Sequence, residues 1–253
     1  MLNVKTSLIL VIFALFAVSA NALAQEQDTV ETCPVTERHC IMTMMQGTAG
    51  KIDNPGWRDQ TYRELAKTLA FDGHTDEAIA LIDKIDNPDT KAMAIRGIGM
   101  TVADNKLTPE AADAVFTKLH ESAKKITHAP SFAIALTYIA MGQAFAGDNE
   151  GAWATAAGME NEALRNKAYG ETAEIQAERK DFAAAMTSIE KIVNPSYRDK
   201  AYATIAKILA DNGMLEESIK AGMAIKDNNY MKSQALQYLL DVQKPREIDK
   251  EKL

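Results

Sequence analysis

The sequence has few aromatic residues, little cysteine and no excess of positive charge. Only 6% of its 253 residues are aromatic, and 28 Lys and Arg stand against 35 Asp and Glu, a formal net charge of -7. Without a net positive field to gather phosphates, the chain is not expected to bind nucleic acid. Apolar residues make up 47% of the sequence, as in an ordinary globular protein. The scarcity of aromatics beside abundant alanine favours closely packed helices.

Long hydrophobic runs are also rare, and the one clear case lies at the N-terminus. The segment 8–20 is apolar apart from Ser19, follows the cationic Lys5 and precedes Ala-Leu-Ala at 22–24, a small-x-small cleavage pattern. Its roughly 13 residues fall short of the about 20 that span a bilayer. We therefore expect residues 1–24 to be a cleaved signal peptide. The mature protein is then exported to the periplasm or the extracellular space, soluble and without stable membrane insertion, and no later segment is expected to be apolar enough to span.

Export decides how the cysteines are interpreted. Cys33 and Cys40 are the only two, so in an oxidising compartment they most simply bond to each other. In one continuous helix their separation would be about 10.5 Å, beyond the roughly 7 Å that a disulfide tolerates. We therefore expect residues 25–40 to form an N-terminal loop that carries the disulfide, as Pro34 favours. A metal site at Cys33, His39 and Cys40 is the weaker alternative, because a distant fourth ligand is missing.

Internal repetition is the most informative feature of the sequence. Lys-Ile-Asp-Asn-Pro at 51–55 returns at 84–88, and again as Lys-Ile-Val-Asn-Pro at 191–195. Residues 52–84 and 192–224 are identical at 13 of 33 positions, where ordinary composition gives about two by chance. The apolar residues at equivalent positions are Ile52, Ile85, Ile126, Met159, Ile192 and Ile225. Their spacings of 33, 41, 33, 33 and 33 residues indicate repeated units, with an eight-residue insertion in the second.

Each unit is predicted to hold two helices. Asn54 and Pro55 form a helix start, because asparagine caps a first turn and proline fits within it. An apolar face at helical spacing follows, made of Tyr62, Leu65, Ala66 and Leu69. Gly73 supplies the turn, since glycine accepts the left-handed backbone that ends a helix. No segment alternates with a period of two, so we expect an all-α protein of about twelve helices.

The remaining boundaries follow from the same pattern. The insertion gives the second unit a longer second helix over about 108–125. The chain then begins with a lone second helix over 41–51 and ends with a lone first helix over 228–242. The repeat region is expected to span 41–243, with a charged tail over 244–253.

The small residues within the units resemble the pattern of a known family. A small residue in the first helix is followed by Gly seven residues later and by Ala twelve residues later. These positions hold Ala66, Gly73 and Ala78 in the first unit and Ala140, Gly147 and Ala152 in the third. Lys180 replaces the glycine in the fourth unit, and the second unit has no turn glycine. This pattern resembles the tetratricopeptide repeat (TPR) family, which implies a right-handed α-solenoid of about five to six TPR-like repeats. Independently of the family, small residues mark where two helices cross closely.

The resemblance also implies where a partner binds. In TPR-like folds the first helix of each unit lines a concave groove, at positions set by its large residue, which is Tyr62 in the first unit. The candidate binding residues at these positions are Arg63, Lys67, Arg96, Met100, Met141, Lys167, Lys200 and Lys207. The same positions of the fourth unit also include Gly170 and Glu174. We expect a peptide or protein partner whose extended segment carries acidic groups or a free carboxylate for these cations to hold.

A second feature of these positions leaves two interpretations open. The last of them is alanine in every unit: Ala70, Ala103, Ala144, Ala177 and Ala210. A row of alanines would let a ligand backbone come close, or it would simply serve the packing of one helix against another.

Catalytic motifs are missing from the sequence. The His-Glu pair at 120–121 opens like a zinc-protease helix, but Lys124 stands where the second histidine is needed. The Gly-Ile-Gly at 97–99 opens like a phosphate-binding loop, but Val102 occupies the third glycine place. The histidines that we expect to be ordinary surface or capping residues are His39, His74, His120 and His128. No catalytic residue, metal site or cofactor is predicted.

Three hypotheses of function follow from the sequence. The first is an exported TPR-like interaction module that holds an extended segment in its groove. The second is an envelope-associated hydrolase or sugar-modifying enzyme built on a helical solenoid. The third is a passive scaffold subunit that associates with further copies of itself.

Overall fold

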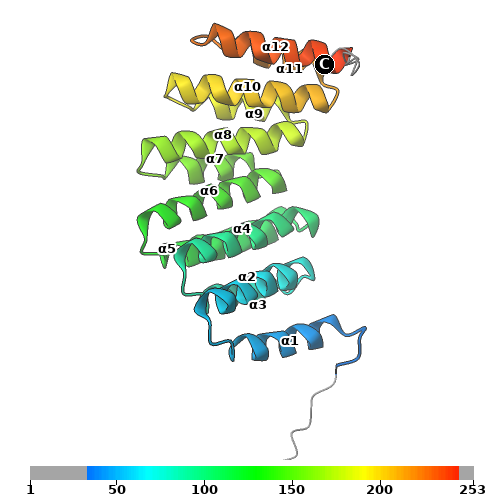
Figure 1. Cartoon of the computed structure of the whole chain (residues 1–253), viewed down its shortest axis with the longest axis vertical. Helices are drawn as coiled ribbons and strands as arrows, with labels where there is room; N and C mark the ends of the chain where they lie inside the picture. Colours follow the sequence, from blue (N-terminus) through cyan, green and yellow to red (C-terminus); the bar gives the residue numbers. More distant parts are fainter. Residues whose placement is uncertain (1–32, 245–253) are drawn as a thin grey trace, which may run out of the picture. The chain divides into compact units, whose positions relative to one another are not determined.

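The computed structural model describes residues 33–244 of the chain (Figure 1). Over this range the chain forms twelve α-helices and no strand, so the all-α prediction is confirmed. The predicted signal peptide over 1–24 and nearly all of the predicted tail over 244–253 lie outside the described residues. The chain divides into two compact units, one up to Met44 and one from Met45 onward.

The N-terminal unit holds both cysteines. The Sγ atoms of Cys33 and Cys40 lie 1.99 Å apart and their Cα atoms 5.7 Å apart, consistent with the predicted pairing. The first helix, α1 (Arg38–Ala49), begins before Cys40. The expected loop over 25–40 was therefore wrong at its C-terminal end, because the helix begins two residues before the second cysteine.

The larger unit is a succession of long and short helices. They are α2 (Pro55–Phe71), α3 (Thr75–Ile82), α4 (Pro88–Asp104), α5 (Pro109–Lys124), α6 (Ala129–Ala146), α7 (Asn149–Ala157), α8 (Glu162–Glu178), α9 (Phe182–Glu190), α10 (Pro195–Asp211), α11 (Leu215–Ala224) and α12 (Asn229–Gln243). From α2 onward the even-numbered helices hold 15 to 18 residues. The odd-numbered helices hold 8 to 10, except α5, which holds 16. The predicted insertion is thus two extra turns of helix α5.

The long helices contact one another in succession, as the order of the ribbons in Figure 1 shows. Helix α2 packs on α4, α4 on α6, and so on to α12, while each short helix packs on the long helix that precedes it. Every repeated unit therefore contributes one long helix to a continuous series, and that series carries all the predicted groove residues.

The repeated Asn-Pro motif begins helices as predicted. The side chain of Asn54 accepts a hydrogen bond from the backbone N–H of Trp57, and Pro55 occupies the first turn of α2. Asn87 does the same at the start of α4 and Asn194 at the start of α10. An asparagine oxygen thereby satisfies a backbone donor that has no partner inside the helix.

A left-handed residue lies in the turn that follows each of the long helices α2, α4, α6, α8 and α10. The glycines with positive φ are Gly73 (88°), Gly147 (93°) and Gly213 (77°), and their role was predicted. Lys106 (48°) and Lys180 (64°) adopt the same conformation in the other two units. The second unit therefore does contain the turn, with lysine in place of glycine.

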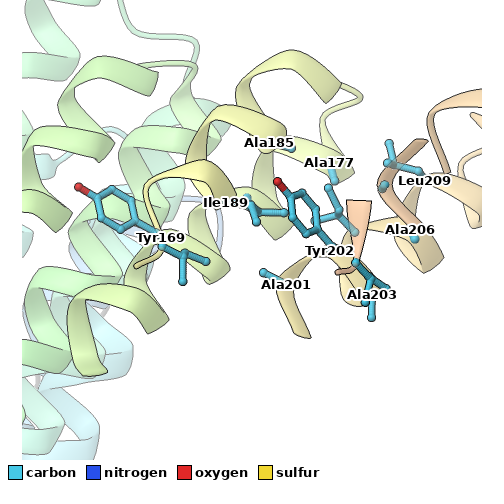
Figure 2. Packing of buried hydrophobic residues seen from close by; sticks show 14 of the residues in the cluster. Tyr169, Ala177, Ala185, Ile189, Ala201, Tyr202, Ala203, Ala206 and Leu209 are labelled. Carbon is cyan, nitrogen blue, oxygen red and sulfur yellow. The ribbon is translucent and has the colours of Figure 1, made fainter. Parts of the chain in front are cut away.

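The core is built of alanine, isoleucine and leucine between the helices. Ala66, Ala78, Ala140 and Ala152 are fully buried, as expected of sites where helices cross closely. Figure 2 shows the packing around Tyr202, where small alanine side chains leave room for the ring between neighbouring helices. Close-packed interiors of this kind gain their stability from apolar area removed from water.

Helix α6 overturns one expectation from the sequence. Within residues 33–244 it is the helix long and apolar enough, by length and composition, to cross a membrane. It packs against α4, α5, α7 and α8, and its polar residues Ser131, Thr137 and Gln143 are buried in those contacts. This environment is that of a core helix.

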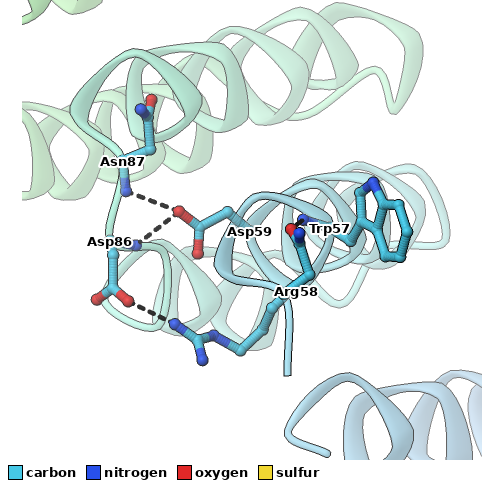
Figure 3. Close-up of polar contacts among 6 residues, drawn as sticks. Trp57, Arg58, Asp59, Asp86 and Asn87 are labelled. Carbon is cyan, nitrogen blue, oxygen red and sulfur yellow. Dashed lines mark hydrogen bonds and ion pairs between the residues drawn. The ribbon is translucent and has the colours of Figure 1, made fainter. Parts of the chain in front are cut away.

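Buried acidic side chains connect the end of one unit to the start of the next. The Oδ2 atom of Asp59 accepts hydrogen bonds from the backbone N–H groups of Asp86 at 3.1 Å and Asn87 at 2.7 Å (Figure 3). Asp199 accepts the N–H of Asp227 at 2.8 Å in the same way. Asn166 occupies the equivalent position in α8, and its Oδ1 accepts the N–H of Val193 at 3.2 Å.

Candidate functional site

All eight predicted groove residues lie on the long helices. Arg63 and Lys67 belong to α2, Arg96 and Met100 to α4, Met141 to α6, Lys167 to α8, and Lys200 and Lys207 to α10. The four lysines and Arg96 are exposed, whereas Arg63 and the two methionines are half-buried. These positions therefore remain available for contact on five consecutive long helices.

Several of the predicted cations already have partners within the chain. Arg63 donates two hydrogen bonds to Glu64 Oε1, at 2.9 and 2.6 Å. The ammonium of Lys167 lies 3.4 Å from a carboxylate oxygen of Glu171. The guanidinium of Arg96 stacks over the Tyr138 ring at 5.3 Å from its centroid. Exposed pairs such as these are worth little to stability and can exchange for a ligand.

Most of the alanines at the last groove position of each unit are buried between helices. Ala70, Ala144, Ala177 and Ala210 are at most 1% exposed, so they lie in the core and cannot face a ligand. Ala103 alone is half-buried. The interpretation in which a ligand backbone approaches the alanines is therefore wrong for these four, and Ala103 keeps an accessible surface.

The two predicted methionines lie beside a small apolar cluster. Met100 and Met141 pack with Phe145 against buried residues of α6, α7 and α8. Their unbranched side chains fill irregular space there, and part of their surface still faces outward. They form an apolar stretch of the long-helix surface between the charged residues of α2 and those of α10.

One hollow gathers several predicted positions. It lies between α8 and α10 and has a volume of about 290 Å³. The predicted groove residues that line it are Lys167, Gly170, Glu174 and Lys200, and the other lining residues are Asn166, Glu171, Tyr197, Ala201 and Thr204. The predicted residues on α2 and α4 do not take part in it.

Gly170 opens the floor of this hollow. A glycine inside a helix costs about 1 kcal/mol relative to alanine. A Cβ atom at Gly170 would meet only the Ala201 Cβ at 3.9 Å, an ordinary contact, so packing does not require glycine here. The missing side chain instead leaves space between the two helices.

The electrostatics of the hollow are mixed. Burial raises the pKa of Glu174, the nearby carboxylates of Glu171 and Glu178 raise it further, and Lys200 opposes them. Two exposed lysines thus face two carboxylates, one of which accepts a proton more readily than an ordinary glutamate. Such a site can hold an anionic group on its lysines and an amide or hydroxyl on its carboxylates.

Asn166 adds a buried donor to the wall of the hollow. It is 1% exposed, and its Oδ1 is used by the backbone of Val193. Its Nδ2 is buried and has no hydrogen-bond partner in the protein. An unpaired buried donor costs free energy, and because Asn166 is as buried as the four core alanines above, this donor lies behind the wall and is not open to a ligand.

Only part of this hollow could be predicted from the sequence. Asn166 stands at the place that holds aspartate in the first and fifth units, and this substitution within the repeat was overlooked. Tyr197, which lines the hollow, lies three residues after the Asn194 cap, and Trp57 lies three residues after Asn54, so an aromatic residue at this place recurs in the repeat. Glu171 lies one helical turn after Lys167, so its pairing with that lysine was predictable from spacing.

Two of the histidines, His120 and His128, belong to the scaffold. His120 Nε2 lies 3.1 Å from Thr155 Oγ1, which donates to Gln143 Oε1 at 2.7 Å. Burial, and to a lesser extent Lys124, lowers the pKa of His120. His128 Nδ1 lies 2.6 Å from Ser131 Oγ at the start of α6.

A matching set of contacts occurs one unit further along the chain. Trp153 replaces His120 and donates its indole N–H to Ser188 Oγ at 2.7 Å, and Ser188 bonds Gln176 Oε1. Because the hydroxyls of both sets are occupied by glutamine, they fasten three helices together and are not poised as nucleophiles.

Comparison with known proteins identifies no relative of this chain. No protein-family model matches the sequence, and neither the curated proteins nor the solved structures contain a significant match.

Proposed function

We propose that the protein is an interaction module that binds an extended segment of a peptide or protein partner along its long helices. The hollow between α8 and α10 is its principal contact. The observation that carries the proposal is that this hollow contains four predicted groove positions, Lys167, Gly170, Glu174 and Lys200, on two adjacent helices. Charged groups, an aromatic ring and an open glycine together favour a specific, polar ligand.

The chemistry of the lining supports a carboxylate as the recognised group. Lys167 and Lys200 are exposed donors on the two helices that border the hollow. An aspartate or glutamate side chain, or a free C-terminus, accepts hydrogen bonds from both ammonium groups. The ring of Tyr197 offers an apolar surface for the neighbouring residue of the segment.

The repeat pattern supports a TPR-like solenoid as the architecture. The left-handed turn residues recur at spacings of 33, 41, 33 and 33, from Gly73 to Gly213. The long helices contact in the same order. Stacked units of this kind form extended surfaces on which a single segment can contact several helices.

The cysteine pair supports export. Disulfides persist in oxidising compartments and are rare in the cytosol. The bond between Cys33 and Cys40 therefore agrees with a protein that acts in the periplasm or outside the cell.

A selected peptide tests the proposal. A random peptide library displayed on phage is selected on the immobilised full chain. One enriched peptide is then synthesised in two forms, one with its carboxylate and one in which that group is converted to an amide. We expect the carboxylate form to bind at least about tenfold more tightly, a difference of about 1.4 kcal/mol. Replacing Lys167→Glu and Lys200→Glu together is expected to weaken it by a similar factor.

Two further variants make this test specific. Lys84→Glu with Lys220→Glu makes the same change of charge at exposed positions outside the hollow and is expected to leave the affinity within twofold. Asn166→Asp recreates the side chain of Asp59 and Asp199, so the fold is retained while a carboxylate ligand is repelled. Equal affinities for all variants would refute the hollow as the binding site.

A further inference from the structure

A second and larger hollow lies at the opposite end of the long helices, where α4 and α6 finish. Its volume is about 590 Å³, within the range of about 300 to 1,000 Å³ typical of small-molecule sites. Its lining includes Val102, Lys106, Leu107, Phe145, Asp148 and Arg179, with Ala112 and Asp113 from α5. None of them belongs to the hollow between α8 and α10.

The insertion in the second unit builds one wall of this hollow. Pro109, Ala112 and Asp113 lie in the first turns of α5, which holds 16 residues where its counterparts hold 8 to 10. In repeat proteins, an insertion in a single unit commonly forms part of a binding surface. Among residues 33–244 no other short helix has the length of α5, so a wall of this length occurs once in the described part of the chain.

The floor of the hollow is apolar. Val102 is 3% exposed, and Leu107 and Phe145 are half-buried beside it. Phe145 belongs to the same apolar cluster as Met100. An alkyl chain or a ring lying on this floor would remove apolar surface from water on both sides.

Two of the polar groups of the hollow, Arg179 and Lys106, are cationic. The Arg179 guanidinium is held in place by a hydrogen bond of 2.6 Å from its Nη1 to the carbonyl oxygen of Ala144. An arginine has five N–H donors, so several remain for a ligand. Lys106 stands in the left-handed turn that ends α4. Among residues 33–244, no carboxylate lies within 4.0 Å of either cation.

The two carboxylates of the hollow are placed differently. Asp148 uses both oxygens within the fold, since Oδ1 accepts the N–H of Gly151 at 2.8 Å and Oδ2 accepts from Gln143 at 3.3 Å. Asp113 is exposed on α5. The hollow therefore offers hydrogen-bond donors beside an apolar floor, which is the pattern that suits an anion with an apolar body.

We propose that this hollow binds a small amphipathic carboxylate. Its carboxylate pairs with Arg179 and Lys106, and its apolar part lies against Val102, Leu107 and Phe145. The site shares no residue with the peptide contact on α8 and α10, so the chain carries two separate carboxylate sites, of which this one also has an apolar floor.

Octanoate and octanol serve as probes, because they share the same chain length and differ in charge. Isothermal titration of the full chain is expected to show saturable binding of one octanoate, with octanol at least tenfold weaker. Arg179→Gln is expected to weaken octanoate binding at least tenfold. Octanol binding as tight as octanoate, or the absence of saturable heat, would overturn the proposal.

Two glycine variants distinguish loss of the site from loss of the fold. Lys106→Gly removes a cation of the hollow and relieves a left-handed lysine, so it is expected to raise the melting temperature while weakening octanoate binding at least threefold. Lys180→Gly gives the same backbone relief outside the hollow and is expected to leave the affinity within twofold. Affinity unchanged in both Lys106→Gly and Arg179→Gln would show that octanoate binds elsewhere.

Discussion

The backbone N–H of Asn87 donates a hydrogen bond of 2.7 Å to the buried carboxylate of Asp59, 28 residues earlier in the chain. Figure 3 shows the carboxylate directed from α2 at the loop that begins α4. The same relationship joins Asp199 to Asp227 at 2.8 Å. In both units a buried aspartate holds the loop whose asparagine caps the next long helix. The position of that next helix is therefore fixed relative to the long helix that carries the aspartate.

Removing this acid is expected to destabilise the protein substantially. Asp199→Ala removes the acceptor of the backbone N–H groups of Lys226 and Asp227. Hydrogen bonds to a charged group are worth about 1.5 to 3 kcal/mol, so we expect the free energy of unfolding in urea to fall by at least about 2 kcal/mol. Asp104→Ala, at an exposed position of α4, serves as the control and should cost less than about 0.5 kcal/mol. Equal losses in the two variants would contradict this role.

The left-handed lysines are expected to be replaceable with a gain in stability. Lys180 has φ of 64°, a conformation that costs an ordinary residue about 1 kcal/mol and costs glycine nothing. Lys180→Gly should therefore raise the melting temperature measured by circular dichroism. Lys220→Gly, within the regular helix α11, should lower it, because glycine costs about 1 kcal/mol in a helix interior. A decrease in both variants would argue against strain at the turn.

Stability is expected to depend on the protonation of His120. Burial lowers the pKa of His120 in the folded chain, and Lys124 lowers it further, while Glu121 partly opposes them. The unfolded chain then binds the proton more readily, so this contribution is fully present above the unfolded pKa of about 6.5 and is lost as the pH falls from there through the lower pKa of the folded chain. Urea unfolding at a series of pH values should show the loss, and His120→Gln should reduce its slope. If the free energy of unfolding of the variant depends on pH as steeply as that of the unchanged protein, His120 is not the source of the dependence.

The disulfide is expected to act on the N-terminal unit. Closing a loop of eight residues contributes about 2.5 kcal/mol by chain entropy, so reduction should release the segment around Cys33 to rapid hydrogen exchange. Peptide mapping without reductant should recover Cys33 and Cys40 in one linked peptide. Two free thiols in protein isolated from its native compartment would contradict the pairing.

The helices could be predicted from the sequence because their determinants are local. An Asn-Pro pair such as Asn54 with Pro55 starts a helix, and a turn glycine such as Gly73 ends one, at each place where the motif recurs. The insertion lengthens the helix in which it lies. The Lys106 turn escaped notice because lysine gives no sign of a left-handed backbone until the repeat is aligned to it. Turn geometry at such a residue is imposed by the packing of the helices on either side.

The candidate site could be predicted only in part, because its geometry depends on contacts between units. Spacing placed Lys167 and Lys200 on exposed positions of long helices. It did not show that Ala177 would be buried, or that Asn166 would keep an unpaired donor beside them, since both depend on how α8 meets α10 and the loop after α9. The pairing of Arg63 with Glu64 likewise requires the side-chain conformation.

The location of a bound peptide on the chain tests the central claim most directly. The selected peptide carries a photoreactive group beside its carboxylate, is irradiated in complex with the full chain, and the attachment site is mapped by mass spectrometry. We predict attachment within α8 and α10, at residues that line the hollow such as Thr204, and loss of attachment in Lys167→Glu with Lys200→Glu. Attachment confined to the short helices α9 and α11, or attachment unaffected by those substitutions, would contradict binding on the long helices.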